Sequence, residues 1–400
     1  MKILMLTPVM LKGHGLPEVV AALIKPLEAL GVTCEVGCME SDGSFGDIKV
    51  HRIGPATGDV QVLLDWVKAD VVIAHGSPYH EVLPHLRGQG MTVAYEHGEP
   101  PPEMFELDSA ARAKRIRSKR VLVYPHVDHV VAISEFIRHD IKWPQANVIF
   151  NGVDHIADLG AKPWLPPWDP NTGLKIGLLM RLGAGEARYK GNDVLPDLRR
   201  LVAERGVQAS WQVMGRGTKQ DAQLLRDQGF EVHLNASDSE RERYLRDIDV
   251  FVTLSKWEGC NLPLVEAEAL GTPGLALDTG SHPEVSPLVF ANLDLMATQI
   301  AAYADSPELL RAHGEDCYTF VRSRMSWNDA AASLLTLVGT KPVTWHGSPG
   351  RALASGSALV WARTTTKWQN ARDLHAAGGM RAVTEVALGK FRRRKVRDDR

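Results

Sequence analysis

The sequence has few cysteines and no long apolar run, and each shortage excludes a class of protein. Four cysteines in 400 residues exclude a disulfide scaffold. Cys34 and Cys38 would share one face of a strand, but no second ligand pair lies nearby, so we expect no metal site. No stretch approaches the ~20 consecutive apolar residues of a membrane-spanning helix, so we expect no transmembrane segment.

The N-terminal stretch MKILMLTPV could be mistaken for a secretory signal. Its apolar part is short, Pro8 interrupts it, and no small-residue cleavage site follows. We therefore expect a first β-strand and a cytoplasmic protein. Peripheral contact with the inner membrane surface is an alternative.

The composition is that of a soluble globular protein long enough for two domains, with 44% hydrophobic and 24% charged residues. The net charge of −2 conceals an asymmetry. From Lys341 onward there are 13 Lys and Arg against 4 Asp and Glu, whereas the rest of the chain has 33 against 44. This basic tail is either a solvated extension or a contact for an anionic membrane or nucleic acid, and both alternatives remain open.

Short apolar segments that read as strands alternate with segments that read as helices. A helix is expected from Pro17 to Leu30, with Gly31 as its C-cap. Such alternation predicts a parallel sheet that is covered by helices on both faces. The expected strands in the first half include Lys2–Pro8, Asp70–His75, Met91–His97 and His129–Ser134.

A proline-rich stretch, Gly160–Gly173, interrupts this pattern, and the alternation then resumes as far as the strand Asp249–Ser255. The predicted fold class is therefore α/β, with two doubly wound, Rossmann-like domains that face each other across a cleft. Ligands of such sheets bind at the carboxyl ends of the strands. The predicted organisation is an N-terminal domain 1–155, a hinge 156–173, a C-terminal domain 174–340 and a basic, partly helical extension 341–400.

The stretch SKWEGCNLPLVEAEALGTPGLA places two carboxylates, Glu258 and Glu266, around the start of a helix. Asn261 is a good N-cap for that helix. A helix N-terminus after a strand is an anion site, and Gly259 allows the backbone to approach the anion closely. Both glutamates can accept hydrogen bonds from hydroxyl groups, although ordinary charges at a helix start would give the same pattern.

Two cations follow the first strand of the second half. Arg181 ends that strand, and Lys190 lies in the loop after it, so both can hold a diphosphate. No Gly-Lys-Ser/Thr follows at the spacing of a P-loop. A second glycine-rich turn, Val213–Gly217, contains Gly215 and is weak evidence alone. Together these residues indicate a ligand with sugar, diphosphate and ribose parts.

The stretch WEGCNLPLVEAEALGTP resembles the Glu-x7-Glu motif of retaining glycosyltransferases of the GT-B fold, glycosyltransferase family 4 in particular. Further segments are similar to that family in the same order along the chain. They are the glycine-rich loop and first helix that begin at Lys12, the segments Val130–Ile141, Val148–Asp154, Arg181–Gly191 and Asp278–Val285, and the late helix that begins at Met325.

The resemblance implies transfer of a hexosyl group from a nucleotide-diphosphate sugar to a hydroxyl acceptor, with retention of configuration. UDP is the commonest donor nucleotide in the family and GDP the next; the acceptor would be a glycan, a lipid-linked glycan or a small molecule. No metal or other cofactor is implied.

The resemblance also implies a role for particular residues. The implied catalytic residues are Arg181 and Lys190 on the diphosphate, Glu258 on the sugar and His97 from the N-terminal domain. The implied donor-binding residues are Glu266, on the ribose, together with Gly13, Gly15, Gly215, Gly259, Cys260, Asn261 and Leu262.

The chain departs from the family at two places. Its first-loop glycines, Gly13 and Gly15, flank His14 instead of being adjacent. Gly98 stands where the family often has Asp after the strand-end histidine, and Glu99 could take over that polar role.

Other interpretations remain open. A sugar-nucleotide epimerase of the same fold, a glycosyltransferase acting on a modified nucleic-acid base, and a noncatalytic nucleic-acid-binding module are the alternatives. The basic stretch Ala111–Arg120 is expected to be a solvated face, with an acceptor phosphate or an anionic membrane as the alternative. For His75 we expect a satisfied loop histidine rather than a substrate contact.

Overall fold

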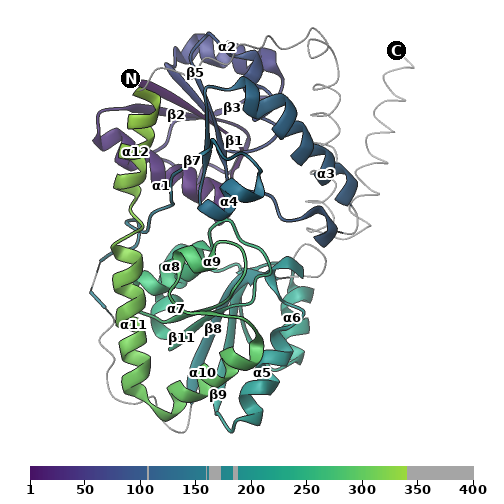
Figure 1. Ribbon diagram of the computed structural model, residues 1–400, viewed down its shortest axis with the longest axis vertical. Helices are drawn as coiled ribbons and strands as arrows, with labels where there is room; N and C mark the ends of the chain where they lie inside the picture. The colour runs from purple at the N-terminus through teal and green to yellow at the C-terminus, as the bar shows by residue number, and fades with distance from the viewer. Residues whose placement is uncertain (106–107, 159, 162–172, 183–187, 340–400) are drawn as a thin grey trace.

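The computed structural model describes residues 1–105, 108–158, 160–161, 173–182 and 188–339. Most of the predicted proline-rich hinge, part of the loop between Arg181 and Lys190, and the basic extension 341–400 lie outside the described residues. The described chain forms two α/β domains that are stacked along the long axis of the molecule (Figure 1). Each is built on one parallel sheet, which confirms the predicted fold class.

The first domain contains a seven-stranded parallel sheet with the order β3-β2-β1-β4-β5-β6-β7. Its central strand β1 (Lys2–Met10) is buried from Ile3 to Leu6, as expected for a strand covered on both faces. The other strands are β2 (Thr33–Ser41), β3 (Val50–Arg52), β4 (Val71–Ala74), β5 (Met91–Glu96), β6 (His129–Ala132) and β7 (Asn147–Val148).

Helix α1 (Gly15–Ala29) buries Val20, Leu23 and Leu27 against this sheet, and Gly31, at φ 81°, follows it as predicted. The other helices of this domain are α2 (Thr57–Val67), α3 (Ser109–Ser118) and α4 (Glu135–Asp140), with short helical turns at Leu83–His85, Pro102–Met104, Lys119–Val123 and Tyr124–His126.

The second domain has a six-stranded parallel sheet with the order β10-β9-β8-β11-β12-β13. Its strands are β8 (Leu174–Arg181), β9 (Ala209–Arg216), β10 (Glu231–Leu234), β11 (Val250–Thr253), β12 (Gly274–Leu277) and β13 (Val289–Phe290). Its helices are α5 (Leu195–Glu204), α6 (Lys219–Asp227), α7 (Asp238–Asp247), α8 (Leu262–Ala269), α9 (His282–Val285), α10 (Leu293–Asp305) and α11 (Pro307–Arg322), with a short turn at Arg188–Lys190.

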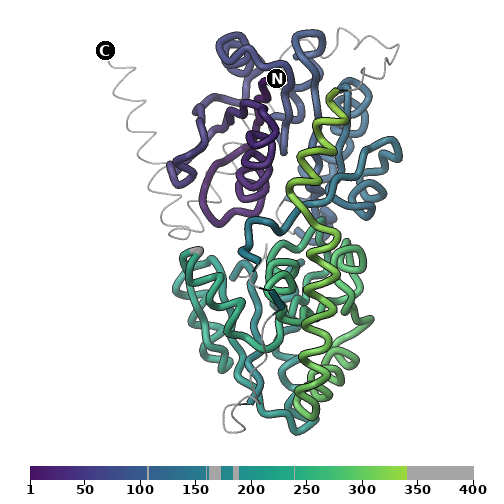
Figure 2. Tube along the Cα trace, turned by 90° about the vertical axis from the view of Figure 1, so that its left-hand side faces the viewer, coloured from purple at the N-terminus to yellow at the C-terminus, as the bar shows by residue number. Residues whose placement is uncertain are grey.

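Helix α12 (Trp327–Gly339) does not belong where the sequence range 174–340 placed it. It packs against α1, and its residues Trp327, Ala331 and Leu334 are buried in the core of the first domain. The last described part of the chain therefore passes from the second domain back to the first, as Figure 2 shows. The reason is its apolar face, which finds its partner surface on α1 rather than on its own sheet.

In both sheets the strand order reverses at the first strand, β1 in one domain and β8 in the other. Ligands of doubly wound sheets bind at such a reversal, beyond the carboxyl ends of the strands. Gly13 follows β1, and Arg181 ends β8, so both predicted site residues lie at these positions. Among the described residues no helix is long and apolar enough to cross a membrane.

Candidate active site

The carboxyl ends of the two sheets meet at the loop that carries Glu258. Gly259 lies directly against the carbonyl oxygen of His97, where a Cβ atom would not fit. The hydroxyl of Ser134, which follows β6, donates a hydrogen bond of 2.9 Å to the carbonyl of Gly259. Gly98, at φ 82°, lies against the ring of Trp257. A side chain on Gly259 would therefore push the domains apart, which gives this glycine a role that the sequence did not reveal.

A second segment supports this loop from within the C-terminal domain and reaches across to the first domain. The backbone N–H of Ser281 donates to the carbonyl of Glu258 at 3.0 Å. Further along, the carboxylate of Glu284 accepts hydrogen bonds from the N–H groups of Glu135 at 2.8 Å and Phe136 at 2.6 Å, at the start of α4. This segment resembles the family in sequence, but no local pattern marks Glu284 as a contact between the domains.

Helix α8 begins as predicted. The side chain of Asn261 accepts from the N–H of Leu264, and its amide donates to the hydroxyl of Thr253 at 2.8 Å. These contacts tie the helix start to the end of β11. Glu258 therefore precedes the helix, Glu266 lies inside it, and both are held at fixed positions.

The structure brings together Lys190 and Glu258, two of the predicted site residues. The Nζ atom of Lys190 donates to Oε1 of Glu258 at 2.5 Å, and Glu258 is only 6% exposed. Burial alone would lower the pKa of Lys190, but the Glu258 carboxylate outweighs this effect and raises that pKa. The lysine is therefore a permanent cation, and it lies over the ring of Tyr189.

Arg181 lies near this pair at the exposed end of β8. Its carbonyl accepts from the side-chain amide of Asn192 at 2.9 Å, which ties the strand end to the loop after Lys190. The positive charge of Arg181 opposes the rise in the pKa of Lys190, as two neighbouring cations must. The two predicted cations thus share one region at the strand ends.

Glu266 is 2% exposed, and its partners come from segments that the sequence analysis did not select. Its Oε1 atom lies 3.0 Å from Nε2 of His155, and its Oε2 atom lies 3.6 Å from Arg241. Because Nδ1 of His155 faces the Nε1–H donor of Trp327 at 3.1 Å, His155 donates from Nε2 to Glu266. The Oε2 atom has no hydrogen-bond partner among the described residues, so it can accept one from a ligand.

His97 follows β5 and lies beside two other rings. Its Nε2 atom is 3.1 Å from Nδ1 of His75, and the ring of Tyr95 stacks against both histidines. His75 lies in the loop after β4, as expected, but it is only 1% exposed; its Nδ1 pairs with His97, and its Nε2 has no partner among the described residues. Burial lowers the pKa of His97 to about 3 and that of His75 well below its usual range. Both rings are neutral at physiological pH.

We expect these two histidines to make the protein less stable in acid. Between pH 6.5 and about 3 the unfolded chain protonates His97 while the folded chain does not, so stability falls as pH falls through that window. The limiting slope is about 1.4 kcal/mol per pH unit for each such histidine. Urea unfolding at several pH values measures it.

The matched comparison uses His97→Asn, which should flatten this slope, and His85→Gln, an exposed histidine that should leave it unchanged. An unchanged slope in His97→Asn would show that His97 titrates normally in the folded protein.

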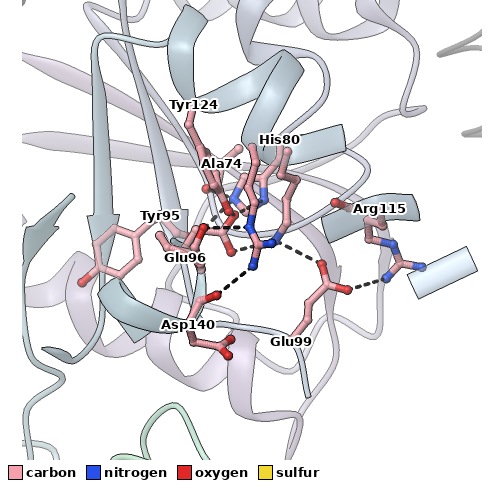
Figure 3. A network of polar contacts seen from close by, with 12 residues as sticks. Ala74, His80, Tyr95, Glu96, Glu99, Arg115, Tyr124 and Asp140 are labelled. Atoms are coloured by element: carbon pink, nitrogen blue, oxygen red, sulfur yellow. Dashed lines mark hydrogen bonds and ion pairs between the residues drawn. The ribbon is translucent and has the colours of Figure 1, made fainter. Parts of the chain in front are cut away.

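A buried charge network lies at the end of β5, and it contradicts the expectation that the basic stretch Ala111–Arg120 is a solvated face (Figure 3). The Nζ atom of Lys119 lies 2.8 Å from Glu96 and 3.0 Å from Glu99, and Lys119 is 3% exposed. Arg115 also pairs with Glu99, at 3.4 Å. Glu99 is thus paired with two cations of the basic stretch, and that stretch is not simply a solvated face.

The remaining predicted residues lie at or near the same strand ends. Gly13 packs on the guanidinium of Arg216, and Gly215 lies against the carbonyl of Met180. Gly15 has open space around its α-carbon, so packing does not require a glycine there. Cys260 and Leu262 are half-buried, and burial raises the pKa of Cys260 to about 12, so it is a thiol.

Two family models match most of the described chain. Residues 14–156 match the model described as Glycosyltransferase Family 4, and residues 176–306 match the one described as Glycosyl transferases group 1. The first match includes His97, and the second includes Arg181, Lys190 and both glutamates.

Solved structures share the fold at low sequence identity. The crystal structure of HepE from Anabaena in complex with UDP and glucose has a TM-score of 0.66 and 16% identity, covering 85% of this chain and 99% of that one. Sucrose-phosphate synthase from Thermosynechococcus elongatus has a TM-score of 0.67 and 16% identity, covering 84% and 98%. These likenesses define the class: two Rossmann-like domains in the GT-B arrangement.

The family models that match the two domains support a glycosyltransferase. A curated relative, the MMP alpha-(1->4)-mannosyltransferase of Mycolicibacterium hassiacum, is 28% identical over 196 residues. The match covers 46% of this chain and spans about half the length of the relative, 47%.

Proposed function

We propose that this protein is a retaining glycosyltransferase that moves a hexosyl group from a nucleotide-diphosphate sugar to a hydroxyl acceptor. The observation that carries the proposal is the Lys190–Glu258 pair, in which Glu258 is buried and Lys190 half-buried, at the strand ends where the two domains touch. A permanent cation beside a carboxylate suits a ligand that has a phosphate next to a hydroxyl-bearing ring. The matches of both domains to glycosyltransferase models support the same assignment.

In this proposal the donor lies along the second domain. Lys190 and Arg181 hold the diphosphate and stabilise the negative charge that it gains on leaving. Glu258 accepts hydrogen bonds from the sugar, and Oε2 of Glu266, which has no hydrogen-bond donor among the described residues, accepts one from the ribose. The neutral His97 reaches the sugar from the first domain. These cationic side chains and the start of α8 supply the positive charge at the diphosphate, so the proposal includes no resident metal or other cofactor.

Retention follows, in this proposal, from attack on the face from which the phosphate leaves. The oxygen of the departing phosphate takes the proton of the acceptor hydroxyl, so no protein nucleophile is needed. The acceptor binds to the first domain, and contact between the domains excludes water that would hydrolyse the donor. We propose UDP as the donor nucleotide, because HepE, which shares this fold, was crystallised with UDP and with UDP-glucose. GDP is the alternative.

A thermal-shift screen with UDP-, GDP- and dTDP-sugars tests the proposal. A donor at 100 times its dissociation constant should stabilise the protein by about 2.7 kcal/mol. Lys190→Ala should lose most of that shift, whereas Lys219→Ala, an exposed lysine on α6, should keep it.

Product analysis with the selected donor then separates the alternatives. Transfer with retained configuration supports the proposal. The absence of any shift, an inverted product, or isomerisation of the donor without an acceptor would each contradict it, and the last would favour an epimerase.

A further inference from the structure

Arg216, which the sequence analysis did not select, occupies the end of the strand beside Arg181. It is the last residue of β9, and the parallel register of β8 and β9 pairs it directly with Arg181. Residues paired in register on neighbouring parallel strands project to the same face of the sheet, about 4.8 Å apart. Two arginine side chains therefore leave neighbouring strand ends, and one of those strands is β8, where the strand order reverses.

The first domain approaches this arginine through Gly13. A Cβ atom on Gly13 would overlap the guanidinium of Arg216, and Gly13 has φ 72°, a conformation that favours glycine. The loop after β1 thus lies directly on the charged end of Arg216. Arg216 is the point where the strand end of the second domain meets the glycine loop of the first.

The charges around the site leave Arg216 available for an anion. The positive charge of Lys190 is already paired with the carboxylate of Glu258, at 2.5 Å. The carbonyl of Arg216 accepts from the N–H of Leu182, but its guanidinium makes no hydrogen bond or ion pair with any residue that the structure describes, and Arg216 is exposed. A diphosphate that leaves a sugar gains a negative charge, and an unpaired guanidinium stabilises that charge more than a lysine already paired with a carboxylate does.

We propose that Arg216 is a third cation of the donor site and binds the diphosphate together with Arg181 and Lys190. This inference rests on the proposed function, because it needs a diphosphate at the strand ends. In this proposal Arg216 has two roles: it binds the phosphate, and its guanidinium contacts the loop that contains Gly13. If Arg216 only packed the domains together, replacing it would affect the binding of ligands with and without phosphates equally.

The test compares UDP, UMP and uridine by calorimetric titration, or GDP, GMP and guanosine where the donor screen selects guanine. Arg216→Gln should weaken binding of the diphosphate by roughly 10- to 100-fold, the size of a charge-assisted hydrogen bond, and leave binding of the nucleoside unchanged. Arg216→Lys keeps the charge but not the planar guanidinium, so its affinity for the diphosphate should lie between that of the parent chain and that of Arg216→Gln. Lys219→Gln is the exposed control, and the thermal midpoint of each unliganded variant checks that it folds.

The possible failures are distinguishable. If Arg216→Gln binds the diphosphate as tightly as the parent chain, or loses uridine binding to the same extent, the role of Arg216 is wrong while the proposed function stands. If the parent chain binds neither diphosphate, the proposed function fails, and this inference fails with it.

Discussion

Replacing either member of the Lys190–Glu258 pair should reduce turnover by at least about 100-fold, the usual effect of losing one contact to transition-state charge. Lys190→Ala removes a cation from the leaving phosphate, and Glu258→Ala removes an acceptor from the sugar and leaves the lysine unpaired. Because Lys190 and Glu258 are partners, the losses of the two single variants should not add: the double variant should lose less activity than the product of the two single losses. Steady-state kinetics with the donor identified in the screen measure kcat and KM for each.

The control for this experiment is Lys219→Ala, an exposed lysine at the start of α6. It should retain the activity of the parent chain. Turnover near the parent value in both Lys190→Ala and Glu258→Ala would refute the roles assigned to this pair. Thermal midpoints of all three variants show whether a loss of activity is a loss of folded protein.

Lys119→Met should cost the protein about 3–5 kcal/mol of stability, the usual result of breaking a buried ion pair from one side. The substitution leaves the buried carboxylate of Glu96 without its lysine and removes one of the two cations that pair with Glu99. Although burial acts to raise it, the pKa of Glu96 is lowered to about 2, since Lys119 and His80 outweigh that burial. Equilibrium unfolding in urea measures the loss.

A double-mutant cycle sharpens this prediction. Glu96→Gln in the Lys119→Met background removes one stranded charge, so the double variant should be more stable than Lys119→Met alone. Lys114→Met, on the exposed face of α3, should change stability by no more than about 0.5 kcal/mol. A Lys119→Met protein as stable as the parent chain would show that the network contributes nothing to the fold.

Features that depend on neighbouring residues could be predicted from the sequence. The buried run of β1, the alternation of strands and helices, and the Asn261 cap of α8 are local patterns, and the structure contains each of them. The positions of Arg181 and Glu258 after strands follow from the same patterns. Their proximity to Lys190 follows from strand ends gathering at one edge of a parallel sheet.

Features that depend on contacts across the chain could not be predicted. His155 is 111 residues from Glu266, and Glu284 is 149 residues from Glu135, so no local spacing links them. Helix α12 has an ordinary apolar face, and nothing in its own residues indicates that the face belongs to the first domain. In the sequence Lys119 is one of several charges in a basic helix, and only the structure shows that it pairs with the buried Glu96.

A crystal structure of the protein with the selected sugar nucleotide bound tests the central claim most directly. The account predicts the diphosphate in contact with Arg181 and Lys190, the sugar hydroxyls on Glu258 and the ribose on Glu266. A donor bound away from these four side chains, or a diphosphate that touches neither cation, would contradict it.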